Sequence, residues 1–255
     1  MLFDPVYWVI LGIGMVLSLW AQAKVKGTFN RFSRQATQSR LTGADVARRI
    51  LADHGVRDVS VEPVRGRLSD HYDPRTKTLR LSEPVFKSNS MAAFGVAAHE
   101  VGHAIQHAQG YAPLKFRSAW VPVANFGSGL SIFIIIAALF MGGAGTALGQ
   151  SMGMLGLGLF ATTTLLTLVT LPVEFDAGRR AGRLPWLSPD AQVEFDASRR
   201  AVLALEKGGY VSTDELQGAR KVLNAAALTY VAAAVTSIMM LLYWAHALGL
   251  LGGRN

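Results

Sequence analysis

The chain has 255 residues, of which 51% are hydrophobic and only 16% are charged, and its net charge is +8. Soluble domains average about 25% charged residues, so this composition predicts a membrane protein. The basic residues lie in blocks beside apolar segments, which argues against a nucleic-acid-binding protein. The chain contains no cysteine, which excludes disulfides and cysteine-ligated metal sites.

The first predicted element, residues 1–23, is a transmembrane helix. Its residues 5–23 carry no charge and are long enough for one span of about 20 residues. No lysine or arginine precedes this run, as a signal peptide would require, and a basic cluster follows it. The positive-inside rule therefore predicts an outside N-terminus and cytoplasmic residues from Lys24 onward.

Residues 24–117 are expected to form a small cytoplasmic α+β segment. A helix is predicted over 43–55, because a threonine cap precedes it and a glycine ends it. Residues 58–64 and 76–82 alternate apolar and polar side chains, which predicts a β-hairpin or a pair of short strands. A second helix, again with a cap before it and a glycine after it, is predicted over 91–110.

The second half of the chain is predicted to return to the membrane. Residues 118–172 carry no charge and are too long for one span, so they predict a helical hairpin. Residues 173–221 are rich in arginine and lysine and are expected to be cytoplasmic, whereas 222–255 contain a fourth span and a short outside tail. The predicted fold class is a mainly α, polytopic membrane protein with about four transmembrane helices and a small α+β cytoplasmic unit.

The predicted helix over 91–110 carries the motif HEVGH. His99 and His103 are four residues apart, so their imidazoles share one helix face and can bind one Zn²⁺. Glu100 lies on a neighbouring edge, where it can act as the catalytic base toward the attacking water. Two core histidines could match this motif by chance, but the helix is plausible and its flanks are uncharged. The apolar run before His99 is too short to span a bilayer, so we expect the site at the cytoplasmic surface.

A hydrolytic zinc site needs a third protein ligand and an open position. Gln109 stands where a metzincin would have its third histidine, which excludes that class. His107 lies two helical turns from His99, too far to bind the same ion, and a supporting or surface role is expected for it. A glutamate from another helix is the remaining option.

Two near-identical copies of one motif offer that glutamate: VEFDAGRRA at 173–181 and VEFDASRRA at 193–201. Glu194 is favoured, because a Ser-Pro-Asp start precedes its copy and predicts a continuous helix. Glu174 stays open as the alternative, since it directly follows a predicted span. Both copies could instead form an arginine-rich helix at the lipid headgroups.

Several stretches, among them LTGADVARRIL, LSDHYDPRTKTLRLS, VAAHEVGHAIQHAQGY, TLPVEFDA and KVLNAAALTYVAAA, make the chain resemble the YugP-like neutral zinc metallopeptidases of bacterial membranes. That family is similar to gluzincin-type membrane proteases such as HtpX. The resemblance implies a bacterial inner-membrane hydrolase with Zn²⁺ as cofactor, His99 and His103 as ligands and Glu100 as base. The family has one EF-x-A-S block where this sequence has two, so the resemblance leaves Glu174 and Glu194 as alternative third ligands.

The stretch LSDHYDPR also recurs in that family. We expect Asp70, His71 and Tyr72 to line the cleft beside a substrate-binding edge strand, where a donor could stabilise the oxyanion. A simple polar turn explains the stretch equally well.

The expected function is a membrane-anchored zinc endopeptidase that cleaves protein or peptide substrates at the cytoplasmic membrane face. Its expected partners are the substrate and the lipid bilayer, without nucleic acid, and the sequence does not predict an oligomeric state. The alternative is a non-catalytic membrane scaffold that retains a zinc site. A metal transporter is disfavoured, because residues 5–23 and the other predicted spans contain no acidic residue.

Overall fold

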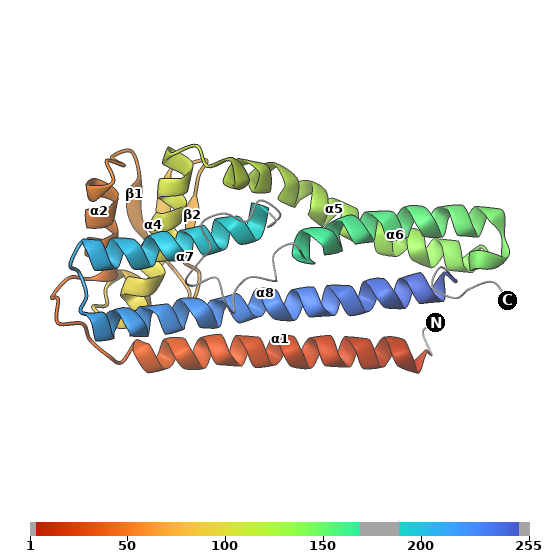
Figure 1. Ribbon diagram of the computed structural model, residues 1–255, viewed down its shortest axis with the longest axis horizontal. Coiled ribbons are helices and arrows are strands. Elements are labelled where there is room, and N and C mark those ends of the chain that lie inside the picture. Colours follow the sequence, from red (N-terminus) through yellow and green to blue (C-terminus); the bar gives the residue numbers. More distant parts are fainter. Residues whose placement is uncertain (1–3, 169–188, 250–255) are drawn as a thin grey trace. The chain divides into compact units, whose positions relative to one another are not determined.

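The computed structural model describes residues 4–168 and 189–249 of the chain (Figure 1). The fold divides into two compact units, which we describe separately. The HExxH unit comprises residues 20–115 and 192–229, and the apolar unit comprises residues 1–19, 116–191 and 230–255.

The HExxH unit is mainly helical and contains one small sheet. The helix predicted over 43–55 is present as α2 and begins with a reciprocal cap. The Thr42 hydroxyl accepts from the Asp45 backbone N–H, and the Asp45 carboxylate accepts from the Thr42 backbone N–H. The helices that contribute to this unit are α1 (Pro5–Phe32, its end), α2 (Gly43–Asp53), α3 (Glu83–Phe86), α4 (Met91–Ala108), α7 (Pro189–Lys207) and α8 (Thr213–Ala247, its start).

The sheet has three strands: β1 (Ser60–Val64), β2 (His71–Asp73) and β3 (Thr78–Ser82). Their order is β1-β3-β2, with β1 parallel and β2 antiparallel to β3. The two predicted strands therefore pair, but the hairpin interpretation is wrong. The segment between them forms β2, which occupies one edge of β3, and β1 pairs with the opposite edge in the parallel direction.

Helix α4 lies at the centre of the HExxH unit, and most of its residues are buried. Two of its glycines bring neighbouring backbones close. A Cβ at Gly95 would lie 3.2 Å from the Ala219 side chain of α8, and a Cβ at Gly102 would lie 2.6 Å from the Ala197 carbonyl oxygen of α7. The contact at Gly102 places α7 directly against the helix that carries both histidines (Figure 1).

The apolar unit contains the start of α1, the end of α8, most of α5 (Ala112–Phe140), the short 3-10 helix η1 (Gly143–Gly145) and α6 (Ala147–Leu168). In this unit α1 runs beside α8 (Figure 1), and the rings of Tyr7 and Trp244 lie 5.9 Å apart. Many large apolar side chains of α1 are exposed, including Trp8 and Val16.

Among the described residues, α1 and α8 are long and apolar enough to cross a membrane, and Gly129–Phe140 is a shorter apolar stretch. Helices α5 and α6 occupy the predicted hairpin region. Helix α5 ends at Phe140 and α6 begins at Ala147, so the connection between these helices is short.

Candidate metal centre

The predicted HExxH helix is α4, which spans 18 residues. The Ser90 hydroxyl accepts from the Ala93 backbone N–H and satisfies one of the free donors at the start of the helix. The regular turn brings the rings of His99 and His103 face to edge, with their centroids 4.8 Å apart. Both side chains are largely buried, with 17% and 11% of their surface exposed.

Helix α7 brings Glu194 to these two histidines. Its Oε2 atom lies 3.2 Å from His99 Nε2 and 3.5 Å from His103 Nε2. Ligands at about 2.0–2.2 Å from a tetrahedral Zn²⁺ lie roughly 3.3 Å from one another, and both distances from Glu194 to the histidines are close to that value. They form a group that can hold a metal, with one ligand atom from each within 4.8 Å of the others. The competing Glu174 lies outside the described residues.

The charges of this cluster depend on one another. Burial alone would raise the pKa of Glu194, but hydrogen bonds from His103 and His99 hold it well below its usual value. Burial alone would lower the pKa of His103, but the hydrogen bond and charge of Glu194, with the charge of Glu100, raise it. The metal-free cluster is thus a buried ion pair, and zinc binding has to release protons from it.

The Nδ1 atoms of the two histidines also have hydrogen-bond partners. His99 Nδ1 lies 3.0 Å from the Ser198 hydroxyl, and His103 Nδ1 lies 3.0 Å from Gln106 Oε1. The Gln106 amide nitrogen in turn donates to Asp196 at 3.0 Å. Analysis of the sequence missed all three partners. Gln106 follows His103 by three residues, and Ser198 follows Glu194 by four. Helical spacing therefore places each on the same helix face as that candidate ligand.

Glu100 follows His99 on α4, and its side chain is buried, with 9% of its surface exposed. Its charge acts on its surroundings: it raises the pKa of His103 and contributes to the raised pKa of Asp70, which is mainly a result of burial. Asp70 accepts hydrogen bonds from the backbone N–H and hydroxyl of Ser82, which join the start of β2 to the end of β3. The electrostatic coupling of Glu100 and Asp70 links the HExxH helix to the β2 side of the sheet.

The other two residues expected to line the cleft, His71 and Tyr72, differ in their contacts. The Tyr72 hydroxyl lies 2.8 Å from His107 Nδ1 on α4, whereas His71 is exposed and its ring nitrogen contacts the carbonyl oxygen of Ser69. Burial, with the charges of Asp58 and Asp73, raises the pKa of Tyr72 to about 12, so its hydroxyl keeps its proton at neutral pH. Only Tyr72 of this pair is therefore directed at the HExxH helix.

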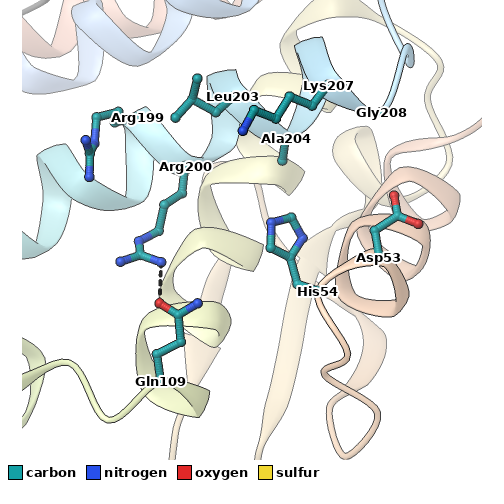
Figure 2. Close-up of a pocket in the computed structure, with 9 residues that line it drawn as sticks. All are labelled: Asp53, His54, Gln109, Arg199, Arg200, Leu203, Ala204, Lys207 and Gly208. Atoms are coloured by element: carbon teal, nitrogen blue, oxygen red, sulfur yellow. Dashed lines mark hydrogen bonds between the residues drawn. The ribbon is translucent and has the colours of Figure 1, made fainter.

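A second feature of the α4–α7 pair is a cavity of about 550 Å³ (Figure 2). It is lined by Asp53, His54, Gln109, Arg199, Arg200, Leu203, Ala204, Lys207 and Gly208. None of the three candidate metal ligands lines it. Arg199 and Arg200 both form ion pairs with Asp196, and Arg200 also donates to Gln109 Oε1 at 2.6 Å. The positive charges at this cavity are thus already partly neutralised.

Proteins similar to this chain are described as zinc peptidases or membrane proteases. Residues 7–192 and 189–249 match the profile of a family described as "Putative neutral zinc metallopeptidase". The chain is also 42% identical, over 228 residues, to the "Putative membrane protease YugP" of Bacillus subtilis (strain 168), and the alignment covers 89% of each chain. No solved structure matches the chain significantly.

Proposed function

Because this chain belongs to the neutral zinc metallopeptidase family, we propose that it is a membrane-anchored endopeptidase that hydrolyses peptide bonds of protein substrates at the cytoplasmic membrane face. The observation that carries the proposal is the convergence of His99 Nε2, His103 Nε2 and the Glu194 carboxylate. Two imidazoles and one carboxylate form the ligand set of the HExxH peptidases with a glutamate third ligand.

In this proposal His99, His103 and Glu194 hold the zinc ion. When bound, zinc supplies a Lewis acid that lowers the pKa of water and polarises the scissile carbonyl. Glu100, adjacent to His99 but on another edge of α4, takes the proton from the attacking water and transfers it to the leaving amine. The hydroxyl of Tyr72, which stays protonated, donates a hydrogen bond to the developing oxyanion.

The substrate would bind as an added strand. β2 pairs with β3 on one side, and among residues 4–168 and 189–249 no strand pairs with its other edge. Tyr72 on β2 contacts His107 of the HExxH helix, so a peptide along this edge would run beside α4. Strand addition uses backbone hydrogen bonds, which predicts tolerance of many side chains in the substrate.

We propose four membrane spans, in α1, α5, α6 and α8. The length and apolar character of α1 and α8 support two of them, and the uncharged sequence of 118–172 supports the hairpin. Residues 24–117 and 173–221, which carry most of the basic residues, would lie in the cytoplasm of a bacterial cell, with both termini outside the inner membrane.

A non-catalytic scaffold is the second candidate. The observation that favours it is the direct hydrogen bond of Glu194 with His99, since an ion pair of this kind can serve structure without a metal. The scaffold has no use for Glu100 as a base, so Glu100 separates the two functions.

The test measures cleavage of an unfolded reporter protein by full-length protein in liposomes, beside its zinc content. Glu100→Gln is expected to abolish cleavage and to retain zinc, whereas Glu206→Gln, a change at an exposed glutamate of α7, is expected to leave both unchanged. Cleavage by the Glu100→Gln variant at the wild-type rate would contradict the proposal. A wild-type protein that binds zinc but cleaves no reporter would favour the scaffold.

A further inference from the structure

We infer that Gln106 and Asp196 are positioning residues that fix His103 in the tautomer whose Nε2 atom is free to bind the metal. This inference rests on the proposed zinc site. It concerns affinity for the metal, which can be measured without any substrate.

The first observation is a continuous hydrogen-bond chain. His103 Nδ1 lies 3.0 Å from Gln106 Oε1, and Gln106 Nε2 lies 3.0 Å from Asp196 Oδ2. Gln106 has none of its surface exposed, so water does not compete for its amide. This hydrogen-bond chain crosses from α4 to α7 and ends on the carboxylate of Asp196, two residues after Glu194.

The second observation is that this chain has a direction. An ionised carboxylate only accepts hydrogen bonds, and Arg199 and Arg200 pair with Asp196 and favour its ionised form. The amide group of Gln106 must therefore turn its NH₂ toward Asp196 and its oxygen toward His103. An oxygen at that position requires a proton on His103 Nδ1, so the neutral ring that binds a metal offers its Nε2 lone pair.

The third observation is the orientation of that Nε2 atom. It lies 3.5 Å from Glu194 Oε2, on the side of the ring away from the Gln106 contact. The nitrogen that is unprotonated in the neutral ring is thus the one that faces the other candidate ligands. Asp196 acts on His103 only through Gln106, which makes it the outer member of the chain.

His99 has a weaker anchor. Its Nδ1 contacts the Ser198 hydroxyl at 3.0 Å, and a hydroxyl can either donate or accept. Ser198 therefore orients the ring without selecting a tautomer. We expect the loss of Gln106 to weaken metal binding more than the loss of Ser198.

The test compares full-length, detergent-solubilised variants by competition for Zn²⁺ with a chelating dye and by the visible spectrum of bound Co²⁺. Gln106→Leu is expected to weaken zinc binding about 10–100-fold, the usual effect of losing a group that supports a metal ligand. Ser198→Ala should cause a smaller loss. Gln109→Leu is the matched control, because Gln109 caps the end of the same helix and hydrogen-bonds to Arg200.

A charge-preserving exchange separates positioning from simple packing. Gln106→Glu alone places two carboxylates side by side and should weaken zinc binding. Combined with Asp196→Asn, it restores an acceptor toward His103 and a donor behind it, so the double variant should recover most of the affinity and the wild-type Co²⁺ spectrum. The double variant also serves if Gln106→Leu fails to fold.

Two results would overturn the inference. One is a zinc affinity of Gln106→Leu equal to that of the Gln109→Leu control. The other is a double variant that binds zinc no better than Gln106→Glu alone. A wild-type protein that binds no zinc would overturn the proposed function as well, whereas tight binding by every variant would overturn only the positioning role.

Discussion

Glu194 Oε2 lies 3.2 Å from His99 Nε2, although 95 residues separate the two in the chain. Helix α7 makes this approach possible because it packs directly on α4 where Gly102 has no side chain. The candidate metal centre therefore depends on the contact between two helices as much as on the HExxH motif itself.

Gly102→Ala tests this dependence. The added methyl group would lie 2.6 Å from the Ala197 carbonyl oxygen, a backbone atom that cannot rotate away. We expect a loss of about 1–3 kcal/mol of stability, as for other overpacked cores, together with weaker zinc binding. The midpoint of thermal unfolding and the zinc content measure both. Gly27→Ala on α1, where a Cβ would have no neighbour within 4 Å among the described residues, is the control, and equal behaviour of the two variants would contradict the prediction.

Tyr72→Phe tests the proposed donor on β2. The change removes the hydroxyl that contacts His107 and leaves the ring, so zinc content should stay at the wild-type level. If this hydroxyl stabilises the oxyanion, kcat should fall about 100–1000-fold with a smaller change in KM. His71→Asn is the control, because His71 is exposed and contacts only the local backbone. An unchanged kcat in Tyr72→Phe would indicate that LSDHYDPR forms a structural turn without a catalytic role.

The turn that follows β2 gives the fold a defined acid sensitivity. Asp73 accepts hydrogen bonds from the Thr76 hydroxyl, the Arg75 backbone N–H and Arg80, which lower its pKa from 3.8 to about 2. Because the folded-state pKa is depressed, this stabilisation is present above about pH 4 and is lost as the pH falls through about 2. Unfolding midpoints measured between these pH values should therefore fall more steeply for wild type than for Asp73→Asn. Parallel curves would contradict this prediction.

The proposed orientation can be tested because the chain has no cysteine. Single substitutions Arg57→Cys and Gly145→Cys add one thiol each at exposed positions, in the proposed cytoplasmic segment and in the proposed outside connection. A membrane-impermeant maleimide applied to spheroplasts should label the variant at 145 and should label the variant at 57 only after lysis. The reverse pattern would place the active site outside.

The sequence predicted the parts of the site that local spacing determines. A four-residue separation on a capped helix is sufficient to bring His99 and His103 together, and the start signals at the beginning of α7 favoured Glu194. These features depend on 3.6-residue periodicity and on caps, which act within a few residues.

The remaining features depend on contacts between distant segments. Alternation of apolar and polar residues does not determine which strands pair. β2 lies beside β3 and the hairpin of the two predicted strands does not form, so the hairpin interpretation was wrong. Gln106 and Asp196 lie on different helices, 90 residues apart in the chain, and nothing in their local sequence indicates that they meet. The start signals favoured Glu194 but left Glu174 open, because both copies of the repeat contain the same glutamate.

The most direct test of the metal centre is the zinc content per chain of purified full-length protein, measured side by side for wild type, Glu194→Gln and Glu174→Gln. We predict about one zinc in wild type and in Glu174→Gln, and a loss of zinc in Glu194→Gln, as expected for a single site with three protein ligands. Retention of zinc by Glu194→Gln with its loss from Glu174→Gln would move the third ligand to the other copy of the repeat. A wild-type protein that contains no zinc and cannot be reloaded would contradict the metallopeptidase account itself.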